Sequence, residues 1–466
     1  MNAQEFTALV ARRSAAEILD TLLALPLEER RTLAPVAADL WKEVDGGRQL
    51  NEWLVLIPGA TTTRTGSLGR VWREQHARLS LAVLALCPID KAKRIRWLGL
   101  RDADGLLLRV CAARDRPWRE AWLRHRLQDE FPGIRWTFVR ALVRDGLCSR
   151  PLESEALRGY LRLMVSDLNP GWPRLAMPYV PLSTRLLADP GLLDEEIWLL
   201  FETDTNAFDD AWLRNHPQRP TDYESWSDAL LRLAGEGRID RQRLLDASLA
   251  GLWKSSNQRV LSGCHQLHSR LAPGADEVDA REEQYRELLS HRSGHVVGFA
   301  LRQLAPIARR RPLAAVPTLA AMAPLFALPA KAQPLAALKL VDRLLQQAKP
   351  DGETAAAAHA VLFEALRHPA GEVQQNAAQL LSACAEAWTD DQRARLRDVV
   401  SELSPLARAQ LVELSGRPAI AGPLPAQREE GATDEVAAEP ETADQQPWLA
   451  RLQALPPRLR ALGGLD

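Results

Sequence analysis

A repeated helical pattern in the second half of the chain constrains its fold more than any other feature. The segment that begins at His295 aligns with the segment that begins at Glu372 at a constant offset of 77 residues. The aligned apolar pairs are Val296 with Val373, Ala300 with Ala377, Leu304 with Leu381, Ile307 with Cys384, and Ala308 with Ala385. A third copy lies between them at an offset of 37, with Ala337, Val341, Leu344 and Leu345. Within each copy the apolar residues are spaced as on one face of a helix.

A repeat of about 40 residues built from two helices is typical of HEAT or armadillo-like arrays. Nearly every other segment also has helical periodicity and is rich in Ala, Leu, Glu and Arg, which favour helices. The one strand-like run is 53–57. We therefore predict an all-α fold, an α-solenoid of antiparallel helix pairs that is irregular in its N-terminal half and more regular in its C-terminal half.

The chain divides into four predicted regions. An irregular helical repeat region covers 1–220, where prolines break its last fifty residues, and a HEAT-like repeat region covers 221–416. A disordered acidic linker rich in Pro and Ala covers 417–447, because this stretch has too few large apolar residues to offset the entropy of ordering. A short amphipathic C-terminal helix covers 448–466.

Apolar periodicity and breaker residues also predict individual helices and core positions. The predicted helices cover 68–86, 89–100, 117–131, 136–147, 153–168, 225–235 and 240–253. The predicted core residues are Leu245, Leu249, Val297, Leu301, Leu304, Val341, Leu380 and Leu381. We also expect Trp253 to share the apolar helix face of Leu245 and Leu249.

Composition argues against a membrane or secreted protein. The 466 residues carry a net charge of −1, so no global field favours nucleic acid or an anionic membrane. The N-terminus lacks the apolar core of a signal peptide, and no uncharged run is long enough to span a membrane. Five scattered cysteines without a CxxC pair fit a reducing compartment. We predict a cytoplasmic protein.

One cluster has metal-ligand character. Cys264, His265 and His268 form a C-H-x-x-H sequence, and Cys264 and His268 share a helix face. A zinc site needs three or four such ligands that converge on one point, and the spacing of a closed site is absent. The alternative is that Cys264 packs as a small apolar residue while the histidines are partly exposed. We predict no metal and no cofactor, with this cluster as a weak candidate.

A second cluster combines basic and aromatic residues. Segment 91–150 contains 15 Lys and Arg against 7 Asp and Glu, and several tryptophans. Such a surface can grip phosphates and stack on bases. The alternative is that tryptophans fill the core while arginines cover outer faces with their long stems. The candidate binding residues are Arg94, Arg96, Arg114, Arg119, Arg124, Arg126, Trp118 and Trp122.

Recognisable catalytic motifs are missing from the sequence. It contains no GxSxG elbow, P-loop, GxGxxG fingerprint or HExxH helix. Eight acids without a base lie between 189 and 210, which is typical of a solvated face and less often of a cation or docking site.

Several stretches carry a resemblance to a known family. They are 238–249 (RIDRQRLLDASL), 267–273 (LHSRLAP), 277–281 (EVDAR) and 106–110 (LLLRV), the last leading to Arg114 and Trp118. Together they resemble an uncharacterised bacterial family of large helical-repeat proteins of unknown function, best represented in actinobacteria. The resemblance covers the chain to about Gly416. It implies an α-solenoid without assigned catalytic residues, relatives that continue beyond this C-terminus, and a SWIM zinc-finger protein as a partner.

These observations favour a non-catalytic scaffold or adaptor that binds a protein partner along its helical array. The alternative is nucleic-acid binding through 91–150. An enzyme comes third, because it requires a buried polar constellation that the sequence does not display.

Overall fold

The computed structural model describes residues 1–45, 65–95, 103–129, 133–169, 179–205, 207–208, 223–347, 352–383 and 390–415. Within these residues there are 23 α-helices, short 3-10 turns and no strand, which confirms the predicted all-α fold. Met1–Gly416 is one compact unit, and Arg417–Asp466 is a separate unit outside the described residues. The strand-like run, the acidic linker and the terminal helix all fall outside the described residues. None of the helices described combines the length and apolar character needed to cross a bilayer.

The N-terminal helices begin at local capping signals. Ser14 and Glu17 form a reciprocal capping box at one helix start. Asp115 caps another, α8, whose first turn contains Pro117, the residue at which the sequence predicts this helix to begin. The helices are α1 (Ala3–Arg12), α2 (Ala15–Ala24), α3 (Leu27–Asp45), α5 (Thr65–Leu86), α6 (Ile89–Ala92), α7 (Ala103–Ala113), α8 (Arg116–Gln128), α9 (Trp136–Arg144) and α10 (Ser154–Leu168).

The proline-rich middle yields short elements, and longer helices follow it. Gly237 takes a positive φ of 67° just after α14, a conformation that glycine adopts readily where a helix ends. The elements are α11 (Leu182–Leu187), α12 (Pro190–Asp194), η1 (Glu196–Phe201), α14 (Trp226–Gly235), α15 (Arg241–Lys254), α16 (Gln258–Leu271), α17 (Ala275–Asp279), α18 (Glu282–Glu287) and η2 (Leu288–Ser290).

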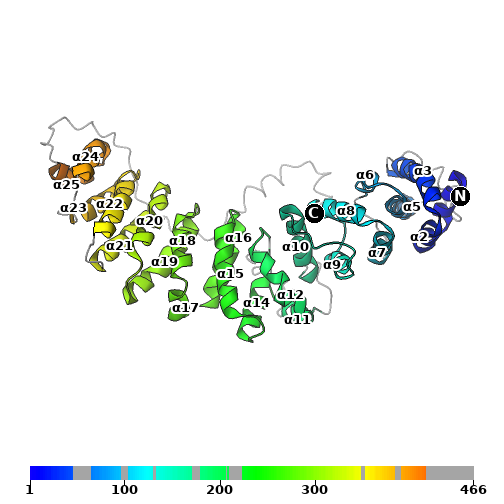
Figure 1. The fold of residues 1–466 in the computed structure, drawn as a ribbon, viewed down its shortest axis with the longest axis horizontal. Helices are drawn as coiled ribbons and strands as arrows, with labels where there is room; N and C mark the ends of the chain where they lie inside the picture. Colours follow the sequence, from blue (N-terminus) through cyan, green and yellow to red (C-terminus); the bar gives the residue numbers. More distant parts are fainter. Residues whose placement is uncertain are drawn as a thin grey trace. The chain divides into compact units, whose positions relative to one another are not determined.

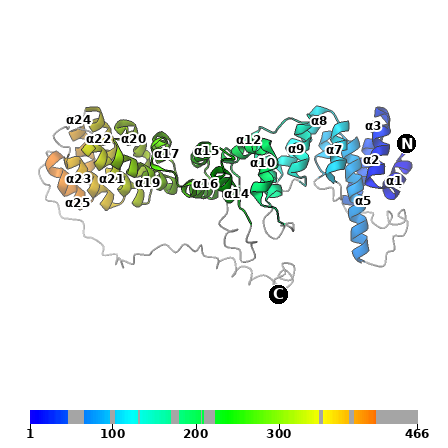
Figure 2. The same ribbon diagram turned by 90° about the horizontal axis from the view of Figure 1, so that it is seen from below.

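The sequence repeat corresponds to a repeat of helix pairs. Its elements are α19 (Gly294–Arg310), α20 (Ala315–Met322), η3 (Ala323–Ala327), α21 (Ala332–Gln347), α22 (Gly352–Leu366), α23 (Gly371–Ala383), α24 (Asp390–Val399), η5 (Val400–Glu402) and α25 (Pro405–Ser415). The first helices of the three copies, α19, α21 and α23, pack side by side in chain order, and α20 packs against α22 (Figures 1 and 2). These contacts are consistent with a helical-repeat arrangement.

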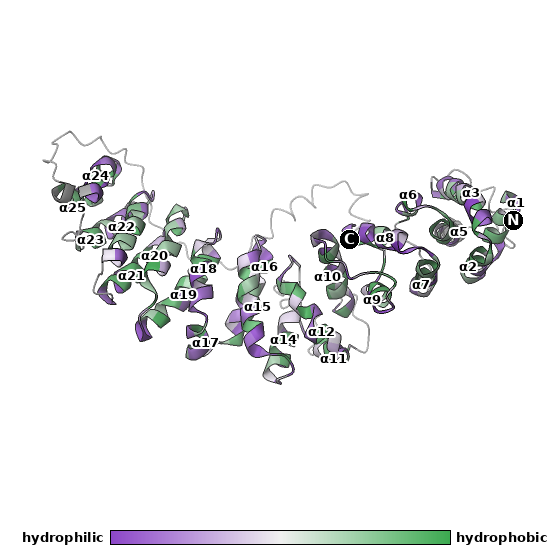
Figure 3. Cartoon of the chain, in the orientation of Figure 1, coloured by the Kyte–Doolittle hydropathy of each residue, from purple (hydrophilic) through white to green (hydrophobic). Residues whose placement is uncertain are grey.

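Matched repeat positions are buried where these helices meet. Ala300, Ala337 and Ala377 are fully buried, as are Leu304, Val341 and Leu381, so each copy buries its apolar stripe against its neighbour. Cys384 and Ala385 fall outside the described residues. Most helices combine polar and apolar positions (Figure 3). Stability is therefore distributed along the array.

The predicted core is confirmed with two exceptions. Six leucines and two valines were expected inside, and all are buried except Leu380, which is half-buried. Trp253 does not share the buried face of α15, because 49% of it is exposed, while Leu252 beside it is fully buried. An offset of one residue turns a helical side chain by about 100°, enough to carry Trp253 off the apolar stripe.

Candidate functional site

The two tryptophans of the predicted basic surface lie in the core. Trp118 and Trp122 of α8 are buried and stack with ring centroids 6.1 Å apart, and Trp122 meets Phe138 edge to face. The indole of Trp118 donates to the Cys87 carbonyl at 3.3 Å. These rings therefore pack neighbouring helices together and offer no face on which a base can stack.

Three candidate arginines cap the ends of neighbouring helices. Arg114 donates to the Ala85 and Cys87 carbonyls at the end of α5, with its guanidinium 4.5 Å from the Trp118 ring centroid. Arg119 donates to the Cys111 and Arg114 carbonyls at the end of α7. The last carbonyls of a helix have no partner within the helix, so each guanidinium satisfies acceptors that would otherwise be orphaned.

The third of these arginines is the most buried. Only 1% of Arg126 is exposed, and its Nη2 donates to the Lys93 carbonyl after α6 at 3.0 Å. The same nitrogen lies 2.7 Å from the Asp129 carboxylate. Arg126 thus holds α6 against α8.

The same device recurs elsewhere in the described chain. Arg185 donates to the Leu168 carbonyl at the end of α10 at 2.9 Å, and Arg241 donates to the Leu271 carbonyl at the end of α16 at 2.7 Å. A high arginine content therefore has a structural use in this fold.

The remaining basic candidates are exposed or lie outside the described residues. Arg94 is exposed after α6, and Arg124 is exposed on α8, where it pairs with Glu153 at 3.0 Å. Arg96 falls outside the described residues. The structure thus brings Trp118, Trp122 and Arg126 together in an interior, and leaves Arg94 and Arg124 on the surface.

Part of the acidic run neutralises this basic segment. Arg140 of α9 pairs with Asp189 and with the buried Glu196, and Arg150 pairs with Glu195 at 2.5 Å. Tyr160 donates its hydroxyl proton to Glu196 at 2.7 Å. The local net charge of +8 in segment 91–150 is thus partly offset by carboxylates that lie about 50 residues further along the chain.

The metal candidates do not converge. Cys264 is fully buried, and burial raises the pKa of its thiol to about 12. His265 is half-buried and packs its ring edge to face on Phe299 at 4.9 Å. Neither predicted alternative describes His268, which is fully buried instead of partly exposed. The described residues contain no group of three His, Cys, Asp or Glu side chains that could hold a metal ion.

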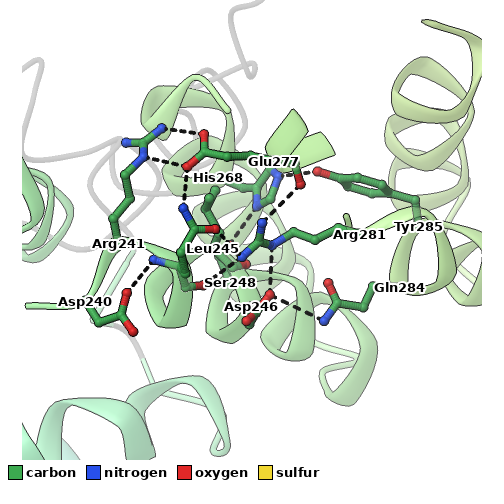
Figure 4. A network of polar contacts seen from close by, with 11 residues as sticks. Asp240, Arg241, Leu245, Asp246, Ser248, His268, Glu277, Arg281, Gln284 and Tyr285 are labelled. Atoms are coloured by element: carbon green, nitrogen blue, oxygen red, sulfur yellow. Dashed lines mark hydrogen bonds and ion pairs between the residues drawn. The ribbon is translucent and has the colours of Figure 1, made fainter. Parts of the chain in front are cut away.

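His268 instead forms the centre of a buried polar triad (Figure 4). Its Nδ1 lies 2.8 Å from the Ser248 hydroxyl and its Nε2 lies 2.8 Å from the Tyr285 hydroxyl. Ser248 gives its single proton to the Leu245 carbonyl at 2.7 Å, so His268 carries its proton on Nδ1 and accepts from Tyr285 on Nε2. All three side chains are fully buried. The triad links α15, α16 and α18.

Burial fixes the charge state of this triad. Desolvation, aided by the nearby positive charge of Arg281, lowers the pKa of His268 to about 4. Desolvation also raises the pKa of Tyr285. Both side chains are therefore neutral at physiological pH, and neither has solvent-exposed surface.

A charged rim surrounds the triad. Arg281 donates to Asp246 at 2.7 Å and to the Gln242 carbonyl at 3.0 Å. Arg241 forms a two-point contact with Glu277 at 2.9 and 3.0 Å, which lowers the pKa of that carboxyl to about 2. The rim ties α15 to α17 and to the turn before α18 (Figure 4).

Sequence reasoning missed this network, although its residues were visible. Arg241, Asp246, His268, Glu277 and Arg281 all fall within the stretches that carry the family resemblance. A usable signal was that Ser248 and His268 occupy apolar helix positions, since buried polar groups need partners. The resembling stretches thus encode a structural junction.

Two open grooves lie along helices that pack in order, one between α16 and α19 and the other between α19 and α21. One, of about 310 Å³, is lined by α16 and the start of α19, including Arg259, Ser262, His265 and His295. The other, of about 540 Å³, is lined by α19 and α21, including Arg302, Arg309, Lys339 and Arg343. The helices that line the two grooves contact one another in order, α16 with α19 and α19 with α21. We call the second one the α19–α21 groove.

The fold defines a helical-repeat protein. Residues 2–332 match the family described as domain of unknown function DUF6493, and the chain belongs to this family. The match ends at the first residue of α21, short of the expected extent to about Gly416. Comparison with curated proteins finds no match, and comparison with solved structures finds none either.

Proposed function

We propose that the chain is a non-catalytic scaffold of HEAT-like repeats that binds a protein partner along the outward sides of α16, α19 and α21. The observation that carries this proposal is the presence of two grooves along three helices that pack in order, α16, α19 and α21. A partner that lies along several helices buries the area that a specific complex needs, about 800 Å² on each side.

The positions of the candidate polar residues in the fold support the same proposal. The Ser248, His268 and Tyr285 triad is sealed inside the fold, and the described cysteines are buried thiols. Trp118, Trp122 and Arg126, which would have served a nucleic acid, pack α8 against its neighbours. Accessible polar groups share a concave site in each of the two grooves.

A pull-down of the tagged full chain from the cytosol of its source tests the proposal. It is run with and without nuclease, at low and high salt, and followed by lysine cross-linking and mass spectrometry. We expect to recover one protein that stays bound after nuclease treatment. It should be cross-linked through Lys331 and Lys339 of the α21 region rather than through Lys42 of α3. Recovery of nucleic acid alone, lost at high salt, would instead support the alternative.

A further inference from the structure

We propose that the α19–α21 groove binds an extended acidic peptide segment of the partner. This inference rests on the proposed function and names the chemistry of the partner. The groove is lined by four exposed cations, Arg302 and Arg309 from α19 and Lys339 and Arg343 from α21. The one acid in its lining is Asp342, which is half-buried and accepts from Gln346 at 2.9 Å.

The cations are regularly placed on the two helices. Arg302 and Arg309 are seven residues apart on one face, a separation of about 10 Å along the helix axis. Lys339 and Arg343 are four apart, or about 6 Å. Alternate residues of an extended peptide are separated by about 6.6 Å, so carboxylates on a short strand can pair with cations of both helices.

One matched position of the repeat carries a cation in the two copies that line this groove. At the matched position of the three repeats stand Arg302, Lys339 and the uncharged Gln379 of α23. If these cations served only to keep the outer face of the helices solvated, we would expect a charged residue at the matched position of the third copy as well. Among these three matched positions, the cations are confined to the first two copies, whose first helices line the groove.

A peptide fits the groove floor better than a nucleic acid does. Leu301 and Leu340 are buried beneath it, and small alanines at 305, 332 and 336 keep it open. Among the described lining residues there is no aromatic ring to stack on a base.

An unpaired acceptor points to a ligand that carries N–H groups. The side-chain oxygen of Gln333 is buried and has no hydrogen-bond partner. Gln333 lies across Gly294 and Gly298 of α19, where an added Cβ would come within 3.4 Å and 3.8 Å of its side chain. A peptide backbone N–H can satisfy this oxygen, whereas the phosphodiester backbone of a nucleic acid has no N–H, although its bases and ribose hydroxyls can donate.

The test is fluorescence anisotropy on the full chain with three labelled probes. They are a Glu-rich peptide of about 12 residues, long enough to exceed the groove, the same peptide with Gln for Glu, and an oligouridine of equal length. The groove variant is Arg302→Glu with Lys339→Glu. The control is Arg395→Glu with Arg397→Glu on exposed positions of α24, which changes net charge equally. Gln333→Leu removes the acceptor without changing charge.

We expect the Glu peptide to bind the wild-type chain, and the Gln peptide to bind at least about tenfold more weakly. The groove variant should lose about tenfold or more of its affinity for the Glu peptide, while the α24 control should keep an affinity near that of wild type. Gln333→Leu should weaken binding several-fold. Failure of the Glu peptide to bind, an equal loss in both charge variants, or tighter binding of oligouridine would each overturn the inference. If the pull-down still yields a protein partner in that case, the proposed function survives without the groove; if it yields none, the proposed function fails whatever the peptide does.

Discussion

Acidification should weaken the junction between α15, α16 and α18 through one side chain, His268. The imidazole is fully buried and neutral between Ser248 and Tyr285. Its two nitrogens already have partners, one as donor and one as acceptor. A second proton would place a charge in a buried site and turn the contact with the Tyr285 hydroxyl from accepting to donating.

The magnitude follows from proton linkage. The pKa of His268 falls from 6.5 to about 4 on folding, chiefly because of burial. Since the folded value is the lower one, the unfolded chain binds more protons between these limits. Stability is therefore complete above pH 6.5 and declines as the pH falls toward 4. Between pH 7 and pH 5 the loss from this residue amounts to about 2 kcal/mol.

Hydrogen exchange of the amides in α15 and α16, corrected for the intrinsic pH dependence of exchange, measures this loss. We compare wild type with His268→Gln, which cannot titrate, and with His295→Gln on the exposed start of α19. His268→Gln should be less stable at pH 7 yet lose about 2 kcal/mol less than wild type by pH 5. If the three proteins lose protection in parallel, the assignment of a neutral buried His268 is wrong.

Three further results are expected. Arg126→Met should destabilise the α6–α8 contact by about 2–4 kcal/mol in urea unfolding, whereas Arg124→Met, two residues away and exposed, should cost less than about 1 kcal/mol; equal effects would refute the capping role. Gly159→Ala should lower the free energy of unfolding by about 3 kcal/mol or prevent folding, because the added Cβ would lie 1.8 Å from the Leu127 carbonyl oxygen. In the control Gly235→Ala the added Cβ meets nothing within 4 Å, so the free energy of unfolding should change by less than about 1 kcal/mol. Native-state labelling with iodoacetamide at pH 8 should leave the four described cysteines unmodified, since burial raises the pKa of each thiol to about 11 or 12. These cysteines are Cys87, Cys111, Cys148 and Cys264. Rapid modification of the folded protein would contradict this expectation.

Features set by apolar spacing were predictable from the sequence. The repeat was visible because the buried stripe of α19 recurs on α21 and α23 with the same residue types. The start of one helix was predicted at Pro117, which favours the first turn, and α8 begins one residue earlier. Both kinds of signal are local, so they do not depend on knowing which helices pack together.

The burial and the partners of the polar side chains were not predictable in the same way. Arg124 and Arg126 look equivalent in the sequence, yet one is exposed and the other caps α6, because the acceptor is a carbonyl of another helix. His268 has the spacing of a metal ligand, but its partners come from α15 and α18. The groove was missed because Arg302 and Lys339 stand apart from the basic segment that composition highlighted.

The measurement that tests the central claim most directly is a quantitative pull-down that compares wild type with two charge-reversed variants. One carries Arg302→Glu and Lys339→Glu in the α19–α21 groove, and the other carries Arg395→Glu and Arg397→Glu on α24. We predict a protein partner that resists nuclease, is recovered equally by wild type and the α24 variant, and is depleted about tenfold or more by the groove variant. Equal recovery by all three proteins, or loss of the bound material on nuclease treatment, would contradict the account.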